Sequence, residues 1–220
     1  MAIPVPVNRD LVGIEYKSFG VSLLFNPTLL PNGRIALQVR PEVSSVVSGG
    51  TVDFGKLSVM DLNMDKDTAL PDRPLVVSVA CDAPTAFTLR LQDNRLGSAT
   101  GPADETTFGL GLDARQQKIG RYRLVFDPLR VTADSFAQLY RTDSATGTSA
   151  WSSASASPLA IGTGRYLGFG ASAGSTSGPV PIQQLSAMAS LEAVIAPLGS
   201  LDLGSEVRLD GSATLELNYL

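Results

Sequence analysis

The segment 211–220 constrains the fold of this chain more than any other stretch. Every second position carries an apolar side chain and the positions between are polar: Ala213, Leu215, Leu217 and Tyr219 alternate with Thr214, Glu216 and Asn218. This two-residue period is typical of a half-buried β-strand. Because a strand must pair its backbone N–H and C=O groups, we expect the segment to lie in a sheet or to be captured by a strand of another protein.

Similar short runs recur through most of the chain, separated by clusters of Gly, Pro, Asp and Ser. We expect strands at Thr51–Val59, Pro74–Asp82, Ala86–Gln92, Thr107–Asp113, Gly120–Phe126, Phe136–Arg141, Leu159–Gly168, Gln184–Ile195 and Ser212–Leu220. Many short strands at this spacing predict an all-β, antiparallel sandwich or barrel. Three runs carry apolar faces that we expect to form the core: Phe87, Leu89, Leu91; Tyr122, Leu124, Phe126; and Ala189, Leu191, Ala193, Ile195.

The N-terminal part predicts a β-hairpin. Val21–Asn26 and Arg34–Arg40 both alternate, and Asn32 and Gly33 lie between them. Asn-Gly favours a type I′ turn, whose two central residues need positive φ, so we expect the hairpin turn at these two residues. Pro41 is expected to end the second strand because it lacks a backbone N–H.

Residues 15–44 resemble the core of bacterial secretins, in particular the outer-membrane secretins of pilus-assembly systems. The segment that carries the resemblance is EYKSFGVSLLFNPTLLPNGRIALQVRPEVS. It implies a piece of an outer-membrane channel for protein secretion or pilus assembly, with the secretion machinery as partner. A single hairpin cannot close a barrel, so this segment alone does not predict a ring.

A second resemblance covers residues 48–220, which are similar to a family of secreted fimbrial-like proteins of unknown function. Seven segments carry it: Val52–Ser58, Val79–Thr85, Asp93–Arg95, Phe108–Leu112, Lys118–Tyr122, Ala193–Leu198 and Leu209–Thr214. That family is similar to chaperone–usher pilus subunits. The resemblance implies an immunoglobulin- or pilin-like sandwich that lacks a strand, which a periplasmic chaperone or a neighbouring subunit supplies by β-augmentation.

On that reading, four residues form the strand-exchange edge that meets the partner: Ala213, Leu215, Leu217 and Tyr219. The resemblance also implies a first strand whose cysteine pairs with Cys81. Cys81 is the single cysteine of the chain, so no internal disulfide forms. From its place in an apolar alternation, we expect Cys81 to be a small buried hydrophobe; the other interpretation is a disulfide half without its partner.

The chain therefore resembles a fusion, with a secretin-like β-hairpin segment over 1–47, a linker at Ser44–Gly50 and a fimbrial-like β-sandwich over 48–220. The leading hypothesis is a structural or adhesive fimbrial-type subunit at the periplasm or cell surface; the alternative is a secretin fragment in the outer membrane. A third hypothesis is that Glu15–Asn26 or Arg34–Arg40 occupies the position of the missing first strand and completes the sandwich in cis.

Composition narrows the function further. A formal charge of -4 and a pI of about 4.8 argue against nucleic acid as a partner. The first seven residues lack the charged and continuous apolar regions of a signal peptide, and no apolar run reaches the roughly 18 residues of a spanning helix. The absence of histidine removes the commonest general base and metal ligand.

No catalytic pattern emerges, so we expect neither an enzyme nor a small-molecule substrate, cofactor or metal. No serine lies on a Gly-x-Ser-x-Gly elbow. Asp61–Asp67 with Asp72 resembles a calcium loop, but Lys66 replaces the glycine of the sharp turn, and a solvated acidic loop is the default. Gly109, Gly111 and Gly120 are expected at bulges or close backbone approaches.

Two surface loops are rich in small polar residues. They are Ser144–Ser157 and Gly170–Gly178, and we expect both to be mobile. Trp151 lies in the first of them. Its ring is expected to pack against the edge of the sandwich, with an exposed recognition aromatic as the alternative.

Overall fold

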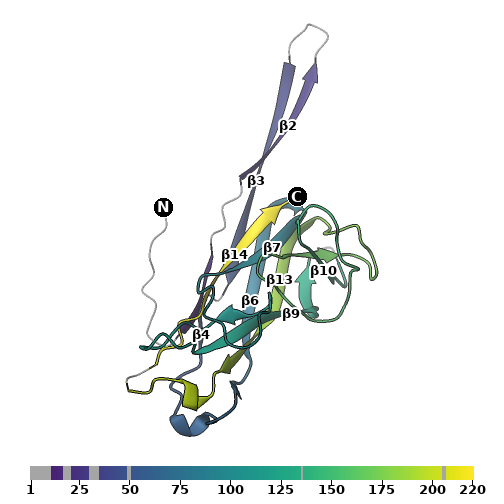
Figure 1. Cartoon of the computed structure of the whole chain (residues 1–220). Coiled ribbons are helices and arrows are strands. Elements are labelled where there is room, and N and C mark those ends of the chain that lie inside the picture. Colours follow the sequence, from purple (N-terminus) through teal and green to yellow (C-terminus); the bar gives the residue numbers. More distant parts are fainter. Residues whose placement is uncertain (1–10, 17–20, 30–34, 49–50, 135, 205–206) are drawn as a thin grey trace.

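The protein is an all-β sandwich of two sheets, as expected (Figure 1). The computed structural model describes residues 11–16, 21–29, 35–48, 51–134, 136–204 and 207–220, with side-chain surroundings from Val52 onward. One sheet has the order β10-β12-β7-β14-β1-β4, and the other has the order β11-β9-β13-β6-β3-β2. Two short strands extend the second sheet, β5 beside β13 and β8 beside β9.

The first sheet contains β1 (Leu11–Tyr16), β4 (Thr51–Asp53), β7 (Phe87–Asp93), β10 (Tyr140–Ser144), β12 (Tyr166–Gly170) and β14 (Ser212–Tyr219). The second contains β2 (Val21–Leu29), β3 (Ile35–Ser48), β5 (Thr68–Ala69), β6 (Arg73–Thr85), β8 (Phe108–Gly109), β9 (Gly120–Ala133), β11 (Leu159–Ala160) and β13 (Ile182–Ile195). Two 3₁₀ turns, η1 (Val59–Asp61) and η2 (Leu198–Ser200), lie together at the lower end of the molecule (Figure 1).

The core lies between the two sheets and contains all three predicted apolar faces. Each of those side chains is at most 2 % exposed, from β7, β9 and β13. Cys81 is 7 % exposed and belongs to the same cluster, which confirms its prediction as a small buried hydrophobe. A two-residue period was sufficient to identify these strands because alternate side chains leave opposite faces of a sheet.

Two of the predicted close approaches are confirmed at glycines. A Cβ at Gly120 would lie 2.3 Å from the carbonyl oxygen of Val194, and one at Gly109 would lie 1.9 Å from Ser98 Oγ. Gly111 has a φ of +91°, which interrupts the strand expected over Thr107–Asp113, so β8 is only two residues long.

The N-terminal hairpin is present, but its second strand is longer than expected. β2 pairs with β3 from Val21 opposite Val43 to Leu29 opposite Ile35. The expected turn residues Asn32 and Gly33 lie outside the described residues. The prediction that Pro41 ends the strand was wrong, since β3 continues through it. Pairing with β6 begins only at Ser44, so β2 is the one described neighbour of Pro41. Because no described strand lies on the other side of Pro41, its missing N–H removes no hydrogen bond there.

The prediction of a linker at Ser44–Gly50 was also wrong for Ser44–Ser48. Ser44–Ser48 forms the end of β3 and pairs with Val77–Cys81 of β6, with Ser44 opposite Cys81. The pairing partner is about thirty residues away, so no local pattern could reveal it. The division of the chain at residues 47 and 48 stays a prediction, while β1 and β3 are hydrogen-bonded to strands from beyond it.

The N-terminal region covers edges of the sandwich, and of the ranges that the third hypothesis named, Glu15 and Tyr16 take part in this pairing, beside Thr214 and Leu215 of β14. Ser44–Ser48, not Arg34–Arg40, lies beside β6, and Leu11–Tyr16 lies in the other sheet beside β14. Figure 1 shows the distal part of the β2–β3 hairpin extending away from the sandwich.

The two small-residue loops contact each other. Ala154 donates a backbone hydrogen bond to Ser175, and Gly174 donates one to Ala154. The indole of Trp151 covers Gly178, where a Cβ would lie 2.5 Å from its Nε1. Trp151 is partly buried, as expected for a ring that packs against the body of the protein.

Candidate strand-exchange edge and apolar pole

β14 lies inside its sheet, between β7 on one side and β1 on the other. It pairs with β7 along its whole length, from Ala213 opposite Asp93 to Tyr219 opposite Phe87. Its pairing with β1 is parallel and, among the described residues, runs from Gly13 beside Ser212 to Tyr16 beside Leu215. β1 in turn pairs with β4 through Leu11, Val12 and Gly13.

The four predicted edge residues share the inner face of β14. Ala213 is 1 % exposed and Leu215 is 0 % exposed, while Leu217 and Tyr219 are partly buried and pack against the core. The structure therefore brings all four together on one face, as the alternation predicted. Their burial decreases toward the end of the strand, beyond the part that β1 covers.

On the β7 side, polar contacts lock β14 in register. Asn94 donates its backbone N–H to the Ser212 carbonyl oxygen at 3.0 Å and its Nδ2 to Ser212 Oγ at 3.0 Å. Thr214 donates its hydroxyl to Asn94 Oδ1 at 3.1 Å. Arg90 and Glu216, which are opposite each other, form an ion pair at 3.7 Å.

The turn that leads into β14 is fixed by a charged contact. Arg95 Nη2 lies 2.7 Å from Asp210 Oδ2, and Arg95 Nε donates to the Asp210 carbonyl oxygen at 3.0 Å. Asp93 accepts the backbone N–H groups of Arg95 and Gly109 at 2.8 and 3.1 Å. Burial nevertheless raises the pKa of Asp93, because desolvation of the carboxylate outweighs these two bonds and the charge of Arg95.

On the β1 side, the described pairing of β14 covers only part of the strand. Past Leu215, no strand of the described chain pairs with Glu216–Tyr219 on the side where β1 lies. In this same stretch, Asn218 Nδ2 and Tyr219 Oη are buried without a hydrogen-bond partner among the residues described. A buried polar atom without a partner costs roughly 1–3 kcal/mol.

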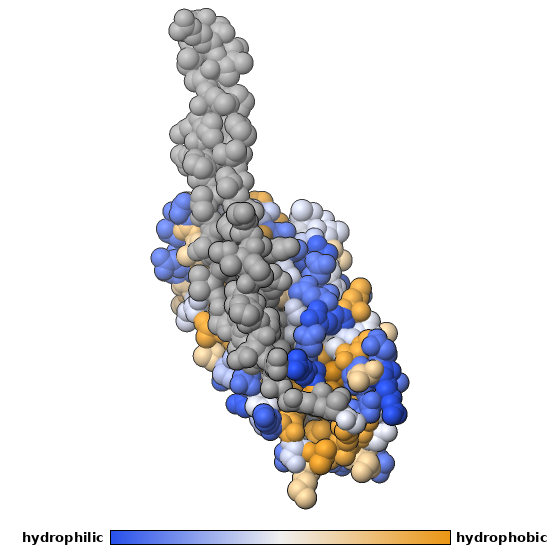
Figure 2. Space-filling model, turned by 90° about the vertical axis from the view of Figure 1, so that its left-hand side faces the viewer, coloured by the Kyte–Doolittle hydropathy of each residue, from blue (hydrophilic) through white to orange (hydrophobic). Residues whose placement is uncertain are grey.

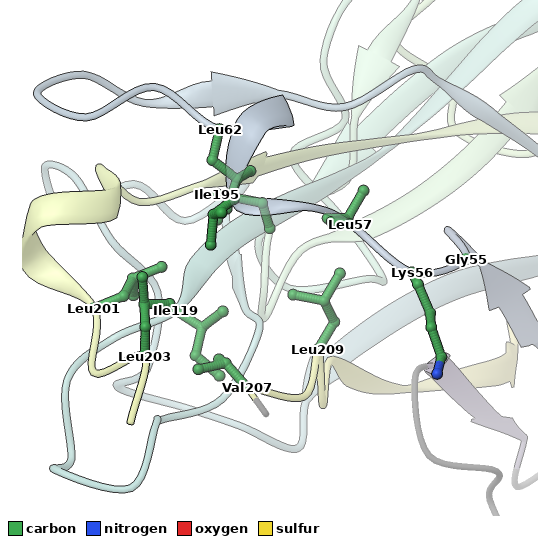
Figure 3. Close-up of a pocket in the computed structure, with 11 residues that line it drawn as sticks. Gly55, Lys56, Leu57, Leu62, Ile119, Ile195, Leu201, Leu203, Val207 and Leu209 are labelled. Atoms are coloured by element: carbon green, nitrogen blue, oxygen red, sulfur yellow. The ribbon is translucent and has the colours of Figure 1, made fainter. Parts of the chain in front are cut away.

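A second feature is the apolar pole at the end of the molecule that carries η1 and η2. Figure 2 shows hydrophobic side chains gathered there. Four large ones on the loops of this end are exposed: Val59 at 53 %, Met60 at 93 %, Met64 at 59 % and Leu203 at 46 %. Between the loops is a cavity of about 260 Å³ (Figure 3).

The calcium-loop residues are engaged in other contacts. Asp61 Oδ2 accepts the backbone N–H of Ser58 and caps η1, and Asp67 forms an ion pair with Arg121 at 2.8 Å. In the part of the chain from residue 52 that the structure describes, no group of three acidic or cysteine side chains could hold a metal ion. Among the described residues, no helix has the length and apolar character needed to cross a lipid bilayer.

Two parts of these sites did not follow from the sequence. β1 was not predicted, although Val12, Ile14 and Tyr16 alternate with Leu11, Gly13 and Glu15 and gave a usable signal. The cavity at the pole was not predicted either, because its walls come from four separate segments. Leu201 and Leu203 hint at it, but spacing alone does not distinguish a lined cavity from a filled core.

Comparison with known proteins gives relatives without an assigned activity. A family described as "Protein of unknown function (DUF1120)" matches residues 37–107, less than half of the chain. The uncharacterized protein YhcF of Escherichia coli (strain K12) is 26 % identical over 216 residues, which covers 85 % of this chain and 88 % of that protein. The family match begins in β3 and ends just before β8, so it crosses the division at residues 47 and 48.

A shorter similarity links the chain to the uncharacterized protein y4xJ of Sinorhizobium fredii (strain NBRC 101917 / NGR234). The two are 40 % identical over 57 residues, which is 26 % of this chain and 14 % of that protein. This chain therefore spans only a small part of that relative.

Proposed function

We propose that this protein is a structural or adhesive fimbrial-type subunit of the bacterial surface that assembles by β-strand exchange, with β14 as the acceptor strand. The observation that carries the proposal is the unequal pairing of β14. Its neighbour β7 pairs with seven consecutive residues in antiparallel register, whereas the described pairing with β1 is parallel and extends from Ser212 to Leu215. A periplasmic chaperone or a neighbouring subunit is the partner that would supply the replacement strand.

Exchange is favoured at the β1 edge of β14 over the β7 edge. Parallel pairs are slightly less stable per residue than antiparallel pairs. A partner strand that displaced β1 and continued past Leu215 would also pair the backbone of Glu216–Tyr219. Ala213 and Leu215 are already buried in the core, so a partner strand would cover further apolar surface only at Leu217 and Tyr219, which are partly buried.

The substitution Leu217→Asp tests the proposal. Leu217 lies beyond the reach of β1 and is partly buried, so a carboxylate there should block strand uptake while the pairing with β7 remains. The probe is a labelled synthetic peptide with the sequence of residues 8–20, which in the register of β1 would extend past Leu217. We expect fluorescence anisotropy to show peptide uptake by the wild-type protein and at least tenfold weaker uptake by Leu217→Asp.

Leu129→Asp is the matched control, because Leu129 is 69 % exposed and lies on β9 in the other sheet. This variant should take up the peptide as the wild type does. Circular dichroism and urea unfolding establish that both variants are folded. Equal uptake by Leu217→Asp and wild type would contradict the proposal.

A second candidate function is a fragment of a secretin-type outer-membrane channel. It is favoured by the β2–β3 hairpin, which is formed by the secretin-like segment and extends beyond the sandwich (Figure 1). Along Val21–Val43 its outer edges have no described neighbour, and such edges could pair with other copies. Sedimentation in mild detergent separates the two functions: a large ring supports the channel, and a monomer or a strand-exchanged polymer supports the subunit.

A further inference from the structure

The cavity at the apolar pole has the chemistry of a site for an alkyl chain. Its walls come from η1 and the loop around it, from Ile119 just before β9, from the end of β13, and from described residues between η2 and β14 (Figure 3). Apart from one lysine, the described side chains that line it are all aliphatic: Leu57, Val59, Leu62, Ile119, Ile195, Leu201, Leu203, Val207 and Leu209.

The shape of the cavity also restricts the ligand. Its volume of about 260 Å³ is below the roughly 300 Å³ at which pockets for drug-sized ligands begin. No aromatic side chain is among the described residues that line it, so none of these would select a planar ring by stacking. A single flexible chain fits these walls better than a two-chain lipid or an aromatic compound.

Among the described residues that line the cavity, one carries a charge, and it is a cation. Lys56 lies at the edge of the apolar cluster, next to Leu209 (Figure 3). Its side chain is exposed and forms no hydrogen bond or ion pair with the residues described. Lys56 is the described lining residue whose charge can meet an incoming anion.

We propose that this cavity binds a free medium-chain carboxylate, with the alkyl chain among the aliphatic walls and the head group paired with Lys56. Charge complementarity at the mouth and an apolar interior are the two requirements of such an amphiphile. The site is independent of strand exchange at β14, and its test does not depend on that function.

The test is calorimetric titration of the full chain with sodium decanoate below its micelle-forming concentration. Decanoate should bind at one site, and hexanoate, which has four fewer methylenes, should bind at least tenfold more weakly because each buried methylene changes affinity about three- to fourfold. Decyltrimethylammonium has a similar chain and a cationic head, and should bind at least threefold more weakly than decanoate.

Two lysine variants locate the head group. Lys56→Gln should weaken decanoate binding about threefold to tenfold and leave the binding of 1-decanol unchanged. Lys66→Gln is the matched control, because Lys66 is another exposed lysine of the neighbouring acidic loop that does not line the cavity. It should leave decanoate binding unchanged.

Each opposite result would overturn the proposal. These results are no binding of decanoate, equal binding of hexanoate, or equal losses in the two lysine variants. Binding of the protein to anionic phospholipid vesicles without binding of free decanoate would assign the pole to a membrane instead. Displacement of bound decanoate by a synthetic peptide of residues 1–10, binding more tightly, would assign it to a chain segment.

Discussion

The two edges of β14 are built differently. Toward β7, seven consecutive residues from Ala213 to Tyr219 are in antiparallel register, and Asn94 and Arg90 add side-chain contacts to Ser212, Thr214 and Glu216. Toward β1, four positions pair in parallel and the remainder of the edge has no described strand. The β7 edge is antiparallel, and the described pairing at the β1 edge is parallel, which is the slightly less stable arrangement per residue.

Two strands in equivalent positions of a sheet can therefore be paired in different ways. Both neighbours of β14 are interior strands of the same sheet. They differ in the length of the register, in its direction and in the side-chain contacts that accompany it. Substitutions in the two neighbours measure whether the differences in pairing correspond to differences in the free energy of unfolding.

Proline substitutions in the two neighbours should give the largest contrast. Arg90 of β7 pairs with Glu216 on one side and with Tyr166 of β12 on the other, so Arg90→Pro should cost roughly 3 kcal/mol or more, or prevent folding. Glu15 of β1 has Thr214 as its one described strand partner, and Glu15→Pro should cost about 1 kcal/mol. Urea unfolding measures both. Equal losses would show that β1 is held as firmly as β7.

A pH titration should give an intermediate effect at the β7 edge. Because burial raises the pKa of Asp93 in the folded state, the fold favours the protonated form. Its contribution to stability is therefore complete below the ordinary value of 3.8 and is lost as pH rises through the raised pKa. The urea midpoint of the wild type should fall relative to that of Asp93→Asn over this range.

Asp143 supplies a control of opposite sign. Burial alone would raise its pKa, but hydrogen bonds from Ser152 and Arg165 and the charges of Arg165 and Arg141 outweigh it and lower the pKa. Stability from Asp143 is thus present above the ordinary value and is lost as pH falls through the lowered pKa. As pH falls through this range, the urea midpoint of the wild type should therefore fall relative to that of Asp143→Asn. If the midpoint of the wild type, relative to each Asn variant, changed with pH in the same direction at both sites, the opposite pKa shifts of Asp93 and Asp143 would be contradicted.

The smallest expected effect concerns the ion pair between Arg90 and Glu216. The two side chains are 38 % and 32 % exposed and their charged atoms are 3.7 Å apart, so solvent screens the attraction. A double-mutant cycle with Arg90→Gln and Glu216→Gln should give a coupling energy of about 0.5 kcal/mol or less. A coupling well above 1 kcal/mol would mean that the charged pair, more than backbone register, holds this edge.

Much of the fold could be predicted because its signals are local. The alternating runs at 87–92, 120–126, 184–195 and 212–220 all form strands, and the core contains the side chains that alternation assigned to it. The same logic placed the four edge residues of β14 on one face. Strand ends were less predictable where proline occurs. β9 continues through Pro128 to Ala133, just as β3 continues through Pro41.

The rest depended on contacts between distant segments. The pairing of β1 with β14 joins residues about two hundred positions apart, and the cavity at the pole combines Lys56 with leucines beyond residue 200. The strand expected over Phe136–Arg141 begins only at Tyr140, because β10 is set by its partner β12. Periodicity reports which face a residue takes, but it does not report which strand lies beside it.

Cysteine cross-linking between two copies of the chain tests the exchange of β1 most directly. One copy carries Glu15→Cys and the other Thr214→Cys, which are register partners, both in a Cys81→Ser background. The copies are mixed, incubated and oxidised. Strand exchange predicts a disulfide-linked pair containing one copy of each, well above the yield for Glu15→Cys mixed with Arg130→Cys, whose cysteine lies on β9 in the other sheet. Equal yields from the two mixtures would contradict the exchange of β1.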